Sequence, residues 1–479
     1  MQRSLDKIYL LTFTQQFINL HSTYLKATGY TMKNAPIISI PFTKNYSQAI
    51  NTIFGHFPLV NDKLKEKKFI FIAGYIDHHY SPYLYSDCIL LKKLCEYIRQ
   101  VNPKARIYIT VNNIFGCCTR LFVNLSELRK ELRKSRVRFL FLDEKASDPI
   151  ILGQGNRSYR INLPRIILDK LINNRSNTLY ISVSPVKTHH HVKFTGSLFH
   201  QLRLIHPTSH EVIHSNAVHK ATADLYNLLK PDLTIMHAIN VISHGILPPM
   251  SRIDSYSNFL NVIIGSTDSL SADLTALKLL GYNSDEITHL KLAQDNNHPS
   301  DTSQVEGEMP RTSGSVPFSI KIADLPQNLD IIIGKNRGEI NCQLGLALHL
   351  IHILHEDLHG YTGFSLIVGN DFQGSQFDHI HEPIVVLGSS CCAEVAPKLN
   401  AKYHDIYYID QFYNLQHLIG VLLKIMHVSA YNFFGTNPIY TWISIAISRL
   451  KGSKYRFPSA PGYLKKWKIQ QPDMERQNR

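Results

Sequence analysis

The chain has 479 residues, enough for two or three domains with apolar cores of their own, and 44% of its residues are hydrophobic. Lysine and arginine (51) exceed aspartate and glutamate (37) by 14, an excess that favours anionic ligands or surfaces. Seven cysteines are too few for a disulfide framework, and no apolar run forms a secretion signal or reaches the ~20 residues of a membrane span. These features argue against disulfide-stapled and membrane-spanning classes, so we expect a cytoplasmic protein without a transmembrane segment.

After a strand/helix extension over residues 1–66, strand-like and helix-like segments alternate along residues 67–294, which we take as one core domain. The alternation predicts an α/β fold with a mainly parallel sheet layered with helices. The predicted strands are Lys68–Ile72, Arg106–Val111, Val137–Leu142, Thr178–Ser182, Leu233–Ala238 and Leu260–Gly265. The predicted helices are Cys88–Gln100, Leu125–Lys134, Arg165–Ile172, Glu211–Leu229 and Ala272–Leu280.

Residues 295–316 are polar and lack periodicity, which predicts a linker. A smaller second α/β section is expected over residues 317–430, followed by a basic aromatic tail over 431–479 that could associate with a surface. The predicted elements of the second section are helix Cys342–Leu358 and strands Asp330–Ile333, Ser365–Val368, Ile384–Leu387 and Ile406–Ile409.

Six basic residues cluster between Arg129 and Arg138 without interleaved aromatic side chains. A solvated basic face explains such a cluster better than a nucleic-acid surface does. Nucleic acid is therefore not an expected partner, whereas a small anionic ligand and a protein partner both stay open.

Polar residues follow two of the predicted strands. Lys187 and His189 come soon after strand Thr178–Ser182, with Thr188 between them. The second strand is followed by Ser266, Thr267 and Asp268, and then by Asp273 near the start of a helix. Because ligands of open α/β sheets bind outside the carboxyl ends of the strands, these residues predict a site there. We interpret Lys187, His189, Asp268 and Asp273 as candidate catalytic residues, and Thr188, Ser266 and Thr267 as candidate anion ligands. Capping of the following helix by Ser266, Thr267 or Asp268 explains the presence of these three residues equally well.

Eight histidines fall between His189 and His219, and imidazole is a common metal ligand. Cys391 follows a strand at the expected start of a helix, a position that favours the thiolate. A divalent metal site would use His189, His191, His219 and Cys391. The alternatives are a polar loop that happens to be rich in histidine and a buried structural cysteine. A third histidine group, His352, His355 and His359, is expected on the solvated face of helix Cys342–Leu358.

Several short motifs follow one another in order. They are Pro185-Val-Lys-Thr-His189, Thr195-Gly196, His219 with Asp224-Leu225, Lys230-Pro-Asp-Leu-Thr-Ile235, Gly265-Ser-Thr-Asp268, Asp273, Leu280-Gly-Tyr282 and His289. Together they resemble the bacterial and archaeal family called domain of unknown function 362 (DUF362), clearly over residues 176–294 and more weakly back to residue 67. Its members are largely uncharacterised, and many carry or neighbour iron–sulfur modules. The resemblance therefore implies an oxidoreductase-like or cofactor-handling role.

The chain departs from the pattern of this family. Phe199-His200 stands where relatives typically have Lys-Asn, and His237-Ala238 stands where they have Asp-Gly. The cysteines left from the C-terminal set of the family are Cys342, Cys391 and Cys392. A four-cysteine iron–sulfur cluster held by this chain alone is therefore not expected. The site has either been rebuilt around histidine or lost its catalytic function.

Two functions follow from these residues. The first is a metal- or anion-handling enzyme with a Lys/His/Asp crevice at the strand ends and a divalent metal as candidate cofactor. The second is a non-catalytic relative that acts as an anion-binding or protein-interaction module.

Overall fold

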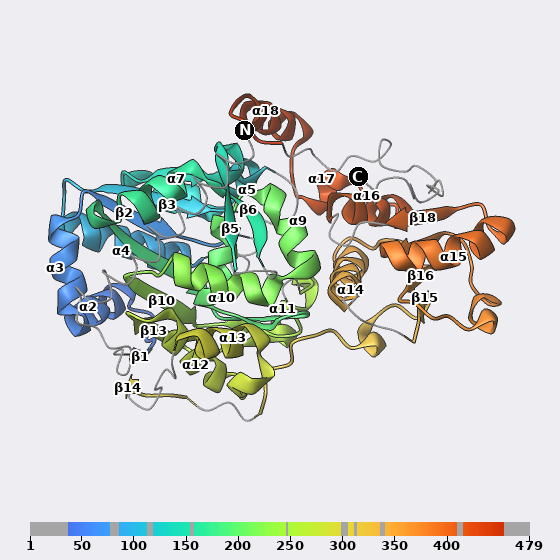
Figure 1. Cartoon of the computed structure of the whole chain (residues 1–479), viewed down its shortest axis with the longest axis horizontal. Helices are drawn as coiled ribbons and strands as arrows, with labels where there is room; N and C mark the ends of the chain where they lie inside the picture. Colours follow the sequence, from blue (N-terminus) through green and yellow to red (C-terminus); the bar gives the residue numbers. More distant parts are fainter. Residues whose placement is uncertain are drawn as a thin grey trace, which may run out of the picture.

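A computed structural model gives the fold (Figure 1). It describes residues 37–76, 86–112, 118–153, 158–245, 248–297, 305–310, 314–335, 341–409 and 415–454. Most of the predicted N-terminal extension and the end of the predicted tail lie outside these residues. None of the helices in the described ranges combines the length and hydropathy needed to cross a bilayer.

The larger of two α/β sheets has eight strands in the order β14-β1-β13-β10-β7-β2-β3-β4. Its strands are β1 (Ile37–Pro41), β2 (Phe69–Ala73), β3 (Arg106–Val111), β4 (Arg138–Phe141), β7 (Thr178–Pro185), β10 (Leu233–Ala238), β13 (Val262–Ser266) and β14 (Val305–Gly307). The five strands from β10 to β4 are parallel, and β13 runs antiparallel to both of its neighbours. The predicted mainly parallel sheet is confirmed.

Alternating side chains of the central strands explain why helices cover both faces of this sheet. Ile70 and Ile72 of β2 belong to one apolar cluster, whereas Phe71 between them belongs to another on the opposite face. The helices packed on the first face are α2 (Tyr46–His56), α3 (Pro58–Glu66), α4 (Cys88–Val101), α5 (Thr119–Leu125) and α6 (Glu127–Glu131). The helices on the opposite face are α7 (Arg165–Ile167), α8 (Ser197–His200), α9 (Pro207–Asn216), α10 (Val218–Leu228), α12 (Ser269–Leu279) and α13 (Thr288–Asn297).

The second sheet has four strands in the order β15-β16-β17-β18, all parallel. Its elements are β15 (Leu329–Ile333), α14 (Asn341–Glu356), β16 (Phe364–Val368), β17 (Ile384–Leu387), α15 (Ser389–Lys402), β18 (Ile406–Ile409) and α16 (Leu415–Ile425). Two further helices follow, α17 (Ala430–Phe433) and α18 (Pro438–Leu450). The smaller C-terminal α/β section is thereby confirmed, and Figure 1 shows α14 between the two sheets.

Short strands that form only by pairing with another segment of the chain were not predicted. β14 falls within the predicted linker, where three residues pair in parallel with β1. The periodicity of the sequence also did not predict two hairpins, one two-stranded ribbon and one short helix. These are β5 (Ser147–Leu152) with β6 (Tyr159–Pro164), β8 (Lys187–His189) with β9 (Lys193–Thr195), β11 (Val241–Ile242) with β12 (Ser257–Asn258), and α11 (Ile253–Tyr256). The predicted helix Glu211–Leu229 is two helices, because the backbone of Ala217 leaves the helical conformation (φ −152°).

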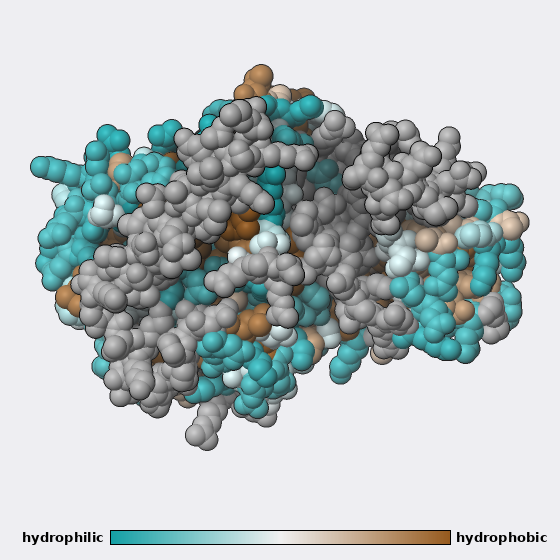
Figure 2. All heavy atoms as spheres, in the orientation of Figure 1, coloured by the Kyte–Doolittle hydropathy of each residue, from teal (hydrophilic) through white to brown (hydrophobic). Residues whose placement is uncertain are grey.

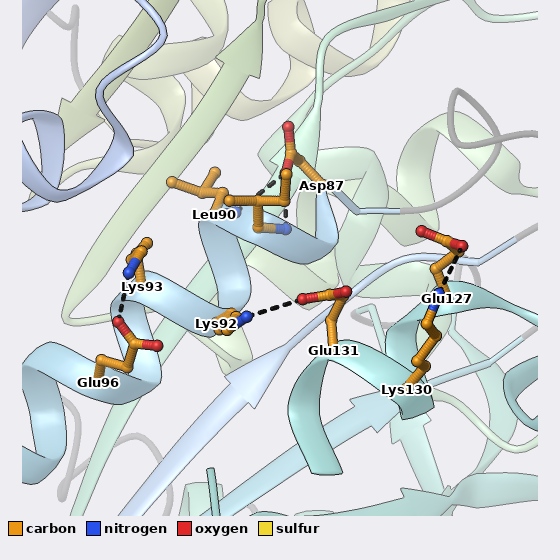
Figure 3. Close-up of polar contacts among 9 residues, drawn as sticks. Asp87, Leu90, Lys92, Lys93, Glu96, Glu127, Lys130 and Glu131 are labelled. Atoms are coloured by element: carbon orange, nitrogen blue, oxygen red, sulfur yellow. Dashed lines mark hydrogen bonds and ion pairs between the residues drawn. The ribbon is translucent and has the colours of Figure 1, made fainter. Parts of the chain in front are cut away.

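The basic cluster at Arg129–Arg138 lies on a surface that carries both charge signs. Figure 3 shows Lys92 of α4 bonded to Glu131 of α6 at 2.9 Å, and Lys130 paired with Glu127 at 3.7 Å. The neighbouring helix α4 is capped by Asp87, whose side chain accepts hydrogen bonds from two of the first backbone N–H groups. Glu131 is the one acidic residue among the six basic residues of this stretch, so the cluster keeps a clear positive charge although Lys92 and Lys130 are paired with glutamates.

Candidate functional site

A two-strand hairpin places Lys187 and His189 at the carboxyl end of β7. The strand ends at Pro185, and β8 then pairs antiparallel with β9, with Lys187 opposite Thr195 and His189 opposite Lys193. Lys193 has a left-handed backbone (φ 65°) where the hairpin closes. Because the hairpin folds back over the sheet, Lys187 and His189 are both buried.

Two buried cations converge on Tyr75, which follows β2. The Lys187 Nζ donates to the Tyr75 hydroxyl at 3.0 Å and lies 4.8 Å from the centre of its ring. The Arg203 guanidinium lies 4.7 Å from the same ring and also donates to the carbonyl oxygen of Asn112 at 3.1 Å. Positive charges stack favourably on an aromatic face, and their effect on an anion is strong where water is excluded.

His189 is fixed as a neutral hydrogen-bond donor. Its Nδ1 accepts the backbone N–H groups of His191 (3.1 Å) and Val192 (3.4 Å), so the ring proton is on Nε2. Burial first, and then the neighbouring histidines, lower its pKa well below the ordinary value of 6.5. A metal on Nε2 would require the proton on Nδ1, where the backbone donors already point. This geometry favours an Nε2–H donor over a metal ligand.

A small pocket, in which the centre of a water molecule can move through about 20 Å³, opens between the strand ends and the helices α8 and α9. We call it the histidine pocket, and it is lined by Tyr75, Ser184, Pro185, His189, Thr195, Gly196, Phe199, His200, Leu202, Arg203, His210 and His214. Desolvation lowers the pKa of His210 well below its usual value and that of His214 to about 3, so both rings are neutral. No acidic side chain is among the described residues that line it.

A second row of histidines lies behind Phe199. The ring centres of His191 and His219 are 5.7 Å apart, and those of His219 and His289 are 5.8 Å apart. Desolvation lowers the pKa of His219 to about 4 and that of His289 to about 3. His289 is fully buried, and neither of its ring nitrogens has a hydrogen-bond partner among the residues that the structure describes.

These side chains are the nearest that the structure comes to the predicted metal site. The rings of His219 and His289 are stacked with 17° between their planes, so their nitrogens do not aim at one point. Across the described ranges, no three histidine, cysteine, aspartate or glutamate side chains are arranged to bind one metal ion. Metal binding through His191 and His219 stays a prediction, and it would require the rings to rotate.

The structure does not bring Ser266, Thr267 and Asp268 to Lys187. We expected both groups at one crevice, but β13 runs antiparallel to β10, so Ser266 pairs with Thr234 rather than with the end of that strand. Asp268 instead caps α12 by accepting from Ser271 and also accepts from the hydroxyl of Tyr226. The side chain of Ser266 bonds the backbone of Asp268. In the described structure the hydroxyl oxygen of Thr267 is buried without a partner.

The other two predicted side chains, Asp273 and Thr188, have backbone partners. The Asp273 carboxylate accepts the backbone N–H groups of Ser197 (2.6 Å) and Leu198 (3.0 Å), which open α8 beside the pocket. Burial raises its pKa to about 7. The Thr188 hydroxyl donates to the carbonyl of Ile242 and accepts from the N–H of Gly245. Both contacts stabilise the backbone around the pocket.

Cys391 belongs to a different core. It packs with apolar side chains of the four-stranded sheet, and its Sγ lies 3.8 Å from the carbonyl oxygen of Ile367. We expected its position at the start of α15 to favour the thiolate. Instead, burial raises the pKa of the thiol to about 12, because desolvation outweighs the helix terminus. The structure therefore does not place Cys391 with the histidines.

Cys391 is expected to resist alkylation by iodoacetamide until the protein unfolds, because the reactive thiolate is suppressed and the sulfur is inaccessible. Cys88 is the internal control, since it is only partly buried although its pKa is also raised, to about 11. Mass spectrometry of tryptic peptides before and after urea treatment would measure both sites. Faster native labelling of Cys391 than of Cys88 would contradict the buried thiol.

Helix α14 of the second section closes one side of the site. His190 follows the pocket histidine His189, and its ring lies 5.2 Å from the ring of His349. Gly345 lies so close to His190 that a Cβ at residue 345 would stand 2.5 Å from the His190 ring. His352 is also fully buried, which corrects the expectation for this residue, whereas His355 is partly exposed and His359 is exposed.

Sequence reasoning missed Tyr75, Arg203 and His289 as parts of the site. Tyr75 follows a predicted parallel strand, so the rule that selected Lys187 would also have selected it. His289 was part of the motif series only. No sequence pattern marks Arg203 as part of the site, because its position depends on how α8 packs.

Comparison with known proteins tests the predicted family resemblance. Residues 77–278 match the model of the family described as Domain of unknown function (DUF362). This match confirms the predicted resemblance. Among solved structures, the lactate racemase apoprotein from Thermoanaerobacterium thermosaccharolyticum aligns with 79% of this chain and 94% of that chain, at 12% identity and a TM-score of 0.36. A TM-score this low supports no conclusion about the DUF362 segment. No curated protein matches the chain.

Proposed function

We propose that the protein is an enzyme that binds a small anionic substrate, or the anionic group of a larger one, in the histidine pocket. The observation that carries this proposal is the lining of the pocket: a buried arginine and four histidines, without an acidic side chain among the described residues. Charge-assisted donors in a dry pocket are the groups that recognise carboxylate or phosphate.

The chemistry supported best is proton transfer. Lys187 and Tyr75 form a bonded pair at the wall of the pocket, so a proton leaving the tyrosine hydroxyl can be replaced from the ammonium group. His189, held with its proton on Nε2, would donate to an oxygen of the substrate. Arg203 would bind the negatively charged group of the substrate.

The departures from the family pattern agree with a rebuilt site. Phe199 and His200, which replace the Lys-Asn of typical relatives, both line the histidine pocket. The Nε2 of His200 is 2.8 Å from the carbonyl oxygen of Gly74, and its ring lies 6.0 Å from that of Tyr75. The oxidoreductase role implied by the resemblance stays a prediction, because the described residues offer no feature that selects redox chemistry.

Sulfate and oxalate titrations followed by calorimetry would test the proposal. We expect both anions to bind the wild-type protein and Arg203→Gln to weaken binding roughly tenfold to a hundredfold, the value of one charge-assisted pair. Arg203→Lys should retain part of the affinity. Arg160→Gln is the matched control, because Arg160 is exposed on β6.

Two results would overturn the proposal. One is anion affinity that is unchanged in folded Arg203→Gln and Lys187→Gln proteins. The other is stoichiometric zinc, nickel or iron in the purified protein that is lost in His219→Phe, which would favour the predicted metal site instead.

A further inference from the structure

Helix α18 has the reverse of the usual polarity of a surface helix. Its buried positions are mainly hydroxyl-bearing: Thr441, Ser444, Ile445 and Ser448. Most of its exposed positions are large and apolar, and the most exposed of these are Leu450 (88%), Ile439 (73%), Trp442 (55%) and Ile443 (53%). Contiguous exposed apolar surface of this kind marks an interaction site. In Figure 2 hydrophobic side chains protrude at the top of the molecule, where Figure 1 shows α18.

Polar contacts hold the helix in this orientation. The Ser448 hydroxyl donates to Glu144 at 2.7 Å, and Ser453, just after the helix, donates to Asp143 at 2.8 Å. At the other end, the side chain of Asn437 caps the first turn. Because these contacts fix the polar face inward, the apolar face is directed outward by the fold and not left exposed by fraying.

The chain segment that contains α18 carries charge of one sign, whereas the acidic Asp143 and Glu144 contact the inward side of the helix and its end. Arg449, Lys451 and Lys454 lie at its carboxyl end, and the whole stretch from residue 411 to residue 472 contains eight lysine and arginine residues and no aspartate or glutamate. A basic segment beside an exposed face with tryptophan and tyrosine is typical of helices that lie in the headgroup region of an anionic bilayer.

We propose that α18 docks the protein on an anionic lipid surface, with the helix axis in the plane of the bilayer. The apolar face would enter the acyl boundary while Arg449, Lys451 and Lys454 meet the lipid phosphates. A second copy of the chain is the alternative occupant of this face, and the test below distinguishes it from a lipid surface. This inference is independent of the histidine pocket.

Co-sedimentation of the full chain with vesicles tests the proposal. We expect binding to phosphatidylcholine vesicles that contain phosphatidylserine, much weaker binding to phosphatidylcholine alone, and release at high salt. The double variant Trp442→Ser/Ile443→Ser should bind at least about tenfold more weakly, because two exposed apolar anchors are lost. The variant Lys451→Gln/Lys454→Gln should lose roughly tenfold through charge.

The matched control is Leu59→Ser/Phe259→Ser, since these side chains are 63% and 62% exposed on other parts of the surface. It should bind like the wild type. All four substituted positions of the apolar variants are exposed, so folding should be unaffected. Equal binding by the α18 variants and the control would overturn the proposal. A dimer in solution that Trp442→Ser/Ile443→Ser dissociates, without vesicle binding by the wild type, would overturn it in favour of a second copy.

Discussion

Acidification is expected to reduce the free energy of unfolding steeply between pH 6.5 and pH 4.5. The pKa values of His214 and His289 are lowered to about 3 and that of His219 to about 4 by burial, against 6.5 in the unfolded chain. Below pH 6.5 the unfolded chain therefore binds protons that the folded protein does not. Each such histidine removes about 1.4 kcal/mol of stability per pH unit as the pH falls.

Two buried carboxyl groups oppose this trend, because burial raises the pKa of Asp143 to about 6 and that of Asp273 to about 7. The folded protein holds these protons at pH 5, whereas the unfolded chain has released them. The pKa values of His189 and His210 are also lowered well below 6.5, and the pKa values of His191, His206, His237, His244 and His352 are lowered as well. Because these histidines outnumber the two aspartates, unfolding takes up protons in this range, and the stability falls with a positive slope against pH.

Urea unfolding at a series of pH values measures this slope. His289→Phe should lower the proton uptake by one, and it should not destabilise the protein at pH 7, because the two ring nitrogens it removes have no partner in the described part of the chain. His404→Gln is the control, because His404 is exposed. Stability that is flat or rises toward pH 4.5 would contradict the buried neutral histidines.

Asp273→Ala is expected to lower the free energy of unfolding by about 2–6 kcal/mol, since it leaves two buried N–H groups without an acceptor. Asp273→Asn keeps one acceptor oxygen and the shape of the side chain, so it should cost less. Thermal and urea unfolding at pH 7 measure both.

Gly196→Ala tests the same contact from the other side. A Cβ at residue 196 would stand 2.4 Å from Oδ1 of Asp273 and 2.8 Å from the ring of Phe194, so the carboxylate would have to leave its position. We expect a loss similar to that of Asp273→Ala, and a double variant that is less than additive. A folded Asp273→Ala protein of unchanged stability would instead favour the predicted catalytic role.

The fold class and most of the strands could be predicted from the sequence. The predicted strands Arg106–Val111 and Leu233–Ala238 agree with the structure at both ends, because buried parallel strands are continuous apolar runs bounded by polar turns. The strand-end rule also selected Lys187 and His189, and both follow the carboxyl end of β7, where His189 lines the histidine pocket and Lys187 bonds Tyr75.

The residues of a strand do not determine in which direction that strand runs in the sheet. Val262–Ser266 is as apolar as its neighbours, yet it runs antiparallel, and that reversal moves Asp268 to the opposite end of the sheet from Lys187. Periodicity reports which residues are buried but not which way the chain enters the sheet.

Burial decided the chemistry of the titrating side chains. The sequence showed many histidines and a cysteine at a helix start, which predicted a catalytic histidine, metal ligands and a thiolate. Desolvation by distant elements instead makes the His189, His210 and His214 rings neutral and the Cys391 thiol inert. The sequence by itself determined the α/β architecture, the strand ends and the excess of positive charge. The tertiary structure alone decided which side chains share a pocket and which protons they hold, because both depend on contacts between residues far apart in the chain.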